Sequence, residues 1–149
     1  MHAPRTIYIV MLFLGWTLAV GSPIAHARSI AIEQFHAELQ VLQSGDLLVT
    51  ETIRPRFSGS WNGLMRDIPV EYRTPQGFNY TLFLDVVSIT DEHLTPLTFD
   101  RSRNRHYQTF KIWLPGAQDT TKTLILTYKI SNGLKYFEDH DELYWNVTG

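Results

Sequence analysis

An alternation of apolar and polar side chains with a period of two residues constrains this chain more than any other feature. The period is clearest over residues 35–41 and 123–131, where the apolar members are Phe35, Ala37, Leu39 and Val41, then Leu124, Leu126, Tyr128 and Ile130. Because successive side chains of a strand point to opposite faces, this period predicts half-buried β-strands.

The remaining strands follow from the same pattern and from the turn residues between them. Gln43–Asp46 supplies turn chemistry between residues 35–41 and a β-branched run from Leu47, which predicts a β-hairpin whose second strand ends near Phe57. Further strands are expected at 80–89, 107–114 and 123–131, separated by loops that contain Pro96, Pro115 and Gly116. No amphipathic helix of ten residues lies between them, so the chain is expected to be all-β, an antiparallel β-sandwich with an Ig-like arrangement of two sheets.

Two regions depart from the strand pattern. Pro55 removes a backbone donor, and Ser58–Gly63 is rich in small residues, so these residues and the following Arg66–Pro69 are expected to form loops. Asp139 and Glu142 have the spacing of a capping box ahead of Leu143, Tyr144 and Trp145, which predicts a short helical turn.

The N-terminal residues have the features of a signal peptide. Met1–Arg5 carries one positive charge, Thr6–Val20 is almost wholly apolar, and Ala25-His26-Ala27 matches a signal-peptidase site. We therefore predict a signal peptide at residues 1–27 and a single domain at 28–149 that is exported to the periplasm or the cell surface. An uncleaved anchor is the alternative, because the apolar run is just long enough to cross a bilayer.

Charge and cysteine content exclude several classes of protein. Removing the first 27 residues, which hold one Arg and no acid, leaves 12 of the 13 basic residues and all 15 acidic ones, a formal charge of −3. So weak a charge on an exported domain argues against nucleic acid as a partner. The chain contains no Cys, so zinc–thiolate sites, thiol nucleophiles and disulfides are excluded.

Four segments resemble a known family. They are Asp46-Leu47-Leu48-Val49-Thr50-Glu51, Phe57-x-Gly59, Gly63-Leu64-x-Arg66-Asp67-Ile68-Pro69 and Asp141-Glu142-Leu143-Tyr144-Trp145-Asn146-Val147-x-Gly149. Their order resembles the N-terminal part of a bacterial family of predicted membrane proteins, domain of unknown function 2207 (DUF2207). The resemblance implies an extracytoplasmic β-domain followed by membrane helices, so we expect this reading frame to be truncated, with residues 28–149 incomplete at their C-terminus. It implies no catalytic residues.

The candidate structural or binding residues are Arg66, Asp67, Trp61 and Trp145. Arg66 and Asp67 lie between Leu64 and Ile68, an apolar frame expected to draw the charged pair partly into the interior. Arg66 is therefore expected to hold a carboxylate or backbone carbonyls, with an external ligand as the alternative. The aromatic residues Trp61, Trp113, Tyr144 and Trp145 are expected to pack in the core or against a sheet, with a sugar platform as the alternative. Trp61 is the exception, because its Gly-rich loop favours exposure.

The ionisable residues offer other candidate sites, for a metal ion, for catalysis or for an anionic partner. Asp139, Asp141 and Glu142 could hold a hard cation, but their spacing fits no EF-hand, so solvated acids are the main interpretation and no metal or cofactor is predicted. His36, His93, His106 and His140 are isolated from one another in sequence, and no motif indicates a catalytic residue. Arg101, Arg103 and Arg105 form a basic run that is either solvated or contacts anionic lipids or a cell-surface polymer.

These features lead to two hypotheses for function. The first is a non-enzymatic extracytoplasmic binding, sensing or scaffold domain that contacts an envelope protein or polymer and is held at the membrane by downstream helices or a retained signal. The second is a hydrolase of envelope polysaccharide or peptide, with or without a metal, that uses the acids around residues 139–142.

Overall fold

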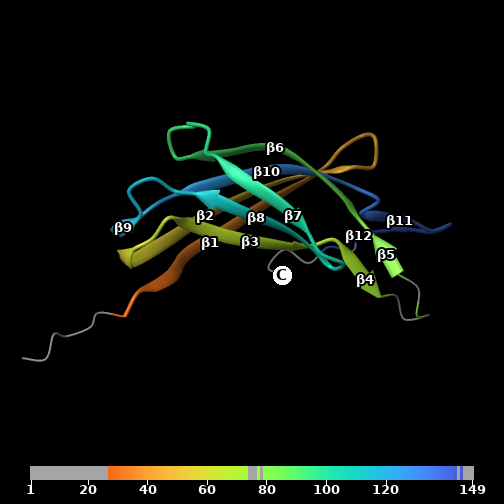
Figure 1. The fold of residues 1–149 in the computed structure, drawn as a ribbon. Helices are drawn as coiled ribbons and strands as arrows, with labels where there is room; N and C mark the ends of the chain where they lie inside the picture. Colours follow the sequence, from red (N-terminus) through yellow and green to blue (C-terminus); the bar gives the residue numbers. More distant parts are fainter. Residues whose placement is uncertain (1–26, 74–76, 78, 144, 146–149) are drawn as a thin grey trace, which may run out of the picture.

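The computed structural model describes residues 27–73, 77, 79–143 and 145, and every regular element in this part of the chain is a β-strand (Figure 1). Residues 1–26 are not described, so the predicted signal peptide at residues 1–27 lies outside the described part of the chain except for its last residue, Ala27. No described helix is long and apolar enough to span a membrane.

Two sheets face each other and form the body of the domain. The larger has the order β1-β2-β10-β6, with β9 paired to the far end of β2; its strands are β1 (Ser29–Val41), β2 (Leu47–Ser60), β10 (Leu124–Ser131), β6 (Phe83–Asp91) and β9 (Gln118–Thr121). The smaller has the order β3-β8-β7, with β3 (Gly63–Pro69), β8 (Tyr107–Trp113) and β7 (Phe99–Arg103). All paired strands are antiparallel. The predicted all-β, two-sheet sandwich is therefore confirmed.

Two short hairpins extend the sandwich at one end, where Figure 1 shows them beyond the main strands. One pairs β4 (Glu71–Arg73) with β5 (Asn79–Thr81), and the other pairs β11 (Leu134–Tyr136) with β12 (Asp141–Leu143). The first hairpin carries the chain from β3 in the small sheet to β6 in the large one.

The core lies between the two sheets and follows the alternation seen in the sequence. Each central strand buries every second side chain; the buried members are Leu47, Val49, Glu51 and Ile53 on β2, Leu124, Leu126, Tyr128 and Ile130 on β10, and Gln108, Phe110 and Ile112 on β8. Burying this apolar surface from two sides is the main favourable term for the fold. The predicted face of residues 124–130 is thus confirmed.

The predicted hairpin at residues 35–53 is also confirmed, but its second strand is longer than expected. β2 continues through Pro55 to Ser60, so the expected end near Phe57 and the loop at Ser58–Ser60 are wrong. Pro55 is tolerated because it lies next to a register shift between Ile32 and Gln34 of β1, where the hydrogen-bond ladder is already interrupted.

The expected loop at Arg66–Pro69 is wrong, because these residues belong to β3. Leu64, Arg66 and Ile68 pair with buried or inward-facing residues of β8, so they form one inward row with period two. The charge of Arg66 in the middle of this row concealed the strand pattern in the sequence.

Two other expectations need correction. The strand predicted at 80–89 is divided at Leu82, whose buried side chain and backbone hydrogen bond to Val70 turn the chain between β5 and β6. The helical turn predicted from Asp139 and Glu142 is wrong, because Asp141–Leu143 pairs as a strand with Leu134–Tyr136. The Asp139 carboxylate contacts the His140 ring at 2.7 Å instead of capping a helix.

Candidate binding groove

Arg66 and Glu51 form the most buried ion pair among the described residues. Arg66 Nε donates to Glu51 Oε2 and Nη2 donates to Oε1, both at 2.8 Å, and the Glu51 side chain is fully buried. Tyr128 donates its hydroxyl to the same Glu51 Oε1 at 2.7 Å. The cluster joins β3 of the small sheet to β2 and β10 of the large one, so it ties the two sheets together across the core.

Electrostatics at this cluster favour the charged pair. Burial lowers the pKa of Arg66, but the hydrogen bond and the charge of Glu51 outweigh it, so the pKa of Arg66 lies above its ordinary value. Burial and the neighbouring Glu51 charge raise the pKa of Tyr128, which therefore stays a neutral donor. Each group already has a partner inside the protein, so the cluster has the arrangement of a structural tie.

Glu51 was missed in the sequence, although one signal was present. Glu51 lies between Val49 and Ile53 in the row of alternate residues that faces inward from β2. The alternation itself therefore placed a charged residue on the inward face. Asp67 was expected to be drawn partly into the interior, but its side chain is exposed and accepts a hydrogen bond from Thr109. The expectation that both charges are drawn inward holds for Arg66 alone.

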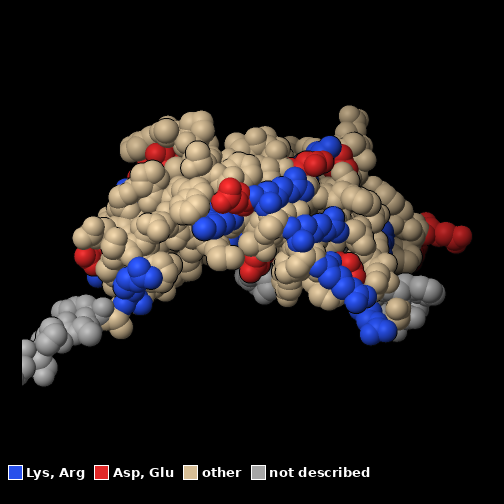
Figure 2. Space-filling model, in the orientation of Figure 1, with Lys and Arg blue, Asp and Glu red and all other residues tan. Residues whose placement is uncertain are grey.

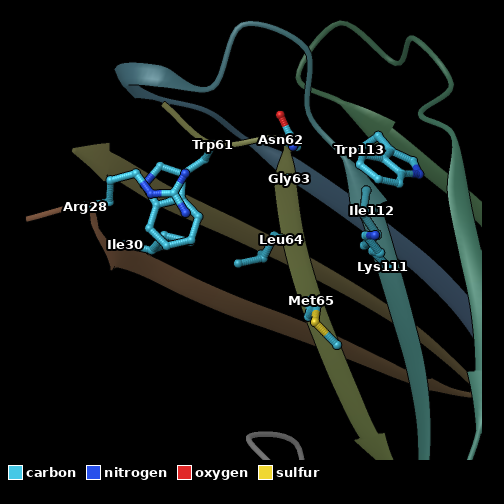
Figure 3. A pocket seen from close by; sticks show the side chains of 10 residues that line it. All are labelled: Arg28, Ile30, Trp61, Asn62, Gly63, Leu64, Met65, Lys111, Ile112 and Trp113. Atoms are coloured by element: carbon cyan, nitrogen blue, oxygen red, sulfur yellow. The ribbon is translucent and has the colours of Figure 1, made fainter. Parts of the chain in front are cut away.

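A groove of about 480 Å³ lies at the start of β3 (Figure 3). Gly63 forms part of its lining. β3 and β8 approach closely here, because a Cβ on Gly63 would come within 1.9 Å of the Ile112 carbonyl oxygen. Trp113, the partner of Gly63 on β8, also lines the groove. Figure 3 shows Trp61 and Trp113 on opposite sides of β3, so an aromatic ring borders the groove on each side.

Each tryptophan of the groove carries a cation over its ring. The Arg28 guanidinium lies 4.9 Å from the Trp61 ring centroid, and Lys111 Nζ lies 4.2 Å from that of Trp113. Contacts of this kind hold a flexible cation in place. Trp61 is itself fixed by a hydrogen bond from Nε1 to the Ser58 carbonyl at 2.9 Å.

The rest of the groove lining is apolar or neutral, with no carboxylate among the described residues that border it: Ile30, Leu64, Met65, Ile112, Asn62 and Gly63. The groove therefore combines apolar walls with two cations. Sequence reasoning singled out Trp61 but did not find Arg28 or Lys111, because only the sheet pairing brings residues 28, 61, 111 and 113 together.

The other residues predicted as candidates lie away from this groove. Trp145 is partly buried against the main core, with 6.2 Å between its ring centroid and that of Tyr128, and its Nε1 has no hydrogen-bond partner among the described residues. Asp139, Asp141 and Glu142 are exposed on or beside the β11–β12 hairpin. Within the described part of the chain, no three His, Asp or Glu side chains gather closely enough to hold a metal ion.

A second hollow of about 530 Å³ lies at the other end of the small sheet, next to β4 and the turn between β7 and β8. Its lining is polar and includes Arg73, Arg105, His106 and Asn79. Among the described residues that line it, Glu71 is the acidic one, and it pairs with Arg105 at 3.4 Å. Like the groove, this hollow is richer in cations than in anions.

Comparison with known proteins gives a family but no activity. Residues 31–149 match the family model described as "Predicted membrane protein (DUF2207) N-terminal domain". No curated protein and no solved structure is significantly similar to the chain. The match covers both sheets, the ion pair and all of the groove except Arg28 and Ile30, of which Ile30 lies directly before it. The chain therefore belongs to the DUF2207 family of predicted membrane proteins and carries the N-terminal domain of that family.

Proposed function

We propose that this chain is the extracytoplasmic, non-enzymatic binding domain of a membrane protein, and that its ligand is an envelope polymer held in the groove beside Gly63. The observation that carries the proposal is the pair of aromatic rings at the groove, each with a cation over its face. Ligand sites combine mostly apolar walls with a few placed polar groups, and this groove has that composition.

The chemistry of the groove favours a sugar polymer over an apolar ligand. The faces of indole rings accept the apolar faces of other rings, while Arg28, Lys111 and Asn62 can donate hydrogen bonds to hydroxyl or acidic groups. The groove is partly open to solvent, so a long chain can lie in it without being fully enclosed.

Binding is tested by titrating the purified full chain with soluble oligosaccharides, neutral maltohexaose and acidic alginate hexamer, in isothermal calorimetry. We expect at least one of them to bind and Trp113→Ala to weaken that binding by about tenfold or more, as for an aromatic residue central to a contact. Trp145→Phe is the matched control, because Trp145 lies outside the groove. Binding by neither sugar, or equal binding by Trp113→Ala, would overturn the proposal.

Export is tested by N-terminal sequencing of the protein released to the outside of the cell. We expect the first residue to be Arg28, which follows the Ala-x-Ala site directly. A chain recovered only from the cytoplasm would exclude the proposed location.

A further inference from the structure

β1 has one edge that pairs with no other strand in the described part of the chain. Along its other edge it pairs with β2 over almost its whole length. In an antiparallel pair only alternate residues exchange hydrogen bonds with the partner, so the remaining residues of β1 direct their N–H and C=O groups away from β2. With the 13 residues of Ser29–Val41, β1 has the longest open edge among the described strands.

The opposite edge of the large sheet, on β6, is covered. The Leu84 carbonyl accepts a hydrogen bond from Arg101 Nη2 at 2.8 Å, and the Ile89 carbonyl accepts one from the Leu97 N–H at 2.9 Å. The loop after β6 and a side chain of β7 therefore occupy backbone groups that β6 would otherwise offer to another strand. For β1, the described loops and side chains provide no comparable cover.

The second part of β1 lacks the features that usually prevent edge strands from pairing. Such strands carry Lys, Pro, inward-pointing charges or bulges. The register shift between Ile32 and Gln34 interrupts only the start of β1. Residues 34–41 contain no Lys, Arg, Pro or Gly, and their inward side chains Phe35, Ala37 and Leu39 are apolar. The edge strands of the small sheet, β3 and β7, are shorter and richer in charge.

The sequence of this part of β1 is complementary to itself when two copies run antiparallel. With Ala37 opposite Ala37 of a second copy, Phe35 lies opposite Leu39 on the inward face, and His36 lies opposite Glu38 on the outward face. His36 and Glu38 are exposed, and within one strand their side chains already approach to 3.4 Å. Apolar and opposite-charge pairs directly across two strands stabilise their pairing, and a two-fold axis forms each of these pairs twice.

The face of the small sheet is a poorer surface for a second copy. Figure 2 shows Lys and Arg atoms spread over the side of the molecule on which Figure 1 places β3, β8 and β7. Two copies stacked on that side would bring positive charges together, which disfavours association. Residues 34–41 hold one His and one Glu, which attract each other across a two-fold axis.

We infer that two copies of this chain associate through the free edges of β1, with Ala37 on the two-fold axis, and so join their large sheets into one continuous sheet. The paired stretch is Gln34–Gln40, about 24 Å long at about 3.4 Å per residue. The partner is a second copy because this stretch supplies both members of every cross-strand pair. The inference goes beyond the proposed function and uses none of the residues that line the groove.

Sedimentation velocity of the purified full chain over a range of concentrations tests this dimer. We expect the natural chain to dimerise as its concentration rises. His36→Glu places a carboxylate opposite Glu38 of the second copy, and Glu38→Lys places an ammonium opposite His36. Each change should raise the dimer Kd about five- to tenfold, because like charges directly opposite destabilise paired strands.

The double variant His36→Glu with Glu38→Lys tests the register. It places opposite charges across from each other again, so its dimer Kd should return to within about threefold of that of the natural chain. Asp85→Lys is the matched control, because it makes the charge change of Glu38→Lys at an exposed position of β6, the other edge strand of the large sheet. It should leave the dimer Kd unchanged.

Circular dichroism should give the same spectrum for every variant, because all of the changed side chains are exposed. A natural chain that stays monomeric at its highest soluble concentration would overturn the inference. So would a dimer that Asp85→Lys weakens and Glu38→Lys does not, since the contact would then lie on β6. A double variant that dimerises as weakly as the single variants would refute the register with Ala37 on the axis.

Discussion

The guanidinium of Arg66 holds the carboxylate of Glu51 with two parallel hydrogen bonds of 2.8 Å between the two sheets of the sandwich. The Arg66 side chain is 11% exposed and that of Glu51 is not exposed at all. Because a bidentate pair has a fixed geometry, this contact sets how the small sheet lies over the large one.

Replacing Arg66 by Ala should strongly destabilise the domain. The change leaves the Glu51 carboxylate buried without a cationic partner, and breaking a buried pair in this way costs about 3–5 kcal/mol. Urea unfolding monitored by circular dichroism measures the loss. Arg56→Ala is the control, since its exposed contact with Glu33 at 3.8 Å should contribute under about 1 kcal/mol. A loss for Arg66→Ala as small as that of the control would contradict a structural role.

Replacing Glu51, Arg66 and Tyr128 together should lower the free energy of unfolding less than replacing Arg66 alone. In the triple variant Glu51→Leu, Arg66→Met and Tyr128→Phe, no buried charge or hydroxyl is left without a partner, and apolar replacements of buried ion pairs are often neutral or stabilising. We expect the triple variant to unfold at a higher urea concentration than Arg66→Met alone. The reverse order would mean that packing around the pair, and not its charge, holds the sheets together.

Gly63→Ala should destabilise the start of β3. Its Cβ would lie 1.9 Å from the Ile112 carbonyl oxygen, so the two strands must separate, and overpacking of this kind typically costs about 1–3 kcal/mol. Gly133→Ala provides the comparison, because its Cβ would meet the Leu47 side chain at 3.0 Å, where a side chain and not the backbone can move. Thermal melts of the two variants should show the larger decrease for Gly63→Ala.

The stability of the turn after β6 should depend on pH in the acidic range, because Asp91 is protonated there. Backbone hydrogen bonds from Thr95 and His93 hold the pKa of Asp91 below its ordinary value of 3.8. A lowered folded-state pKa contributes stability that is present above pH 3.8 and is lost as the pH falls through the folded value. The melting temperature of Asp91→Ala should therefore lie below that of the natural chain at pH 7, and the gap should narrow below about pH 4. A gap that is constant with pH would refute the role of the charge.

His140 should titrate above its ordinary range. Its contacts with Asp139 and then Glu142 raise the pKa of His140 above 6.5. A raised pKa contributes stability to the β11–β12 hairpin that is complete below pH 6.5 and is lost as the pH rises through the folded value. NMR titration of the His140 ring protons should give a midpoint above pH 6.5, and Asp139→Asn should lower that midpoint. An unchanged midpoint in Asp139→Asn would show that the Asp139 contact does not form in solution.

The alternation of side chains determined the all-β class, the hairpin at residues 35–53 and the buried face of 124–130. It could do so because a strand with one solvent-exposed and one buried face is a local property of the sequence. The alternation failed at β3, where Arg66 takes an inward position. A charged side chain can occupy that position only because it has a partner of opposite charge on β2. It failed again at Asp139–Leu143, where pairing with Leu134–Tyr136 overrides the local helix signal.

The groove was decided by tertiary structure alone. Arg28, Trp61, Lys111 and Trp113 are far apart in the sequence, and no local pattern specifies that β3 pairs with β8 or that the start of β1 reaches Trp61. Single-residue preferences act over a few positions, whereas a site between strands depends on which edges pair and in what register. The sequence therefore determined which faces must be buried, and the packing of the two sheets determined which exposed residues meet.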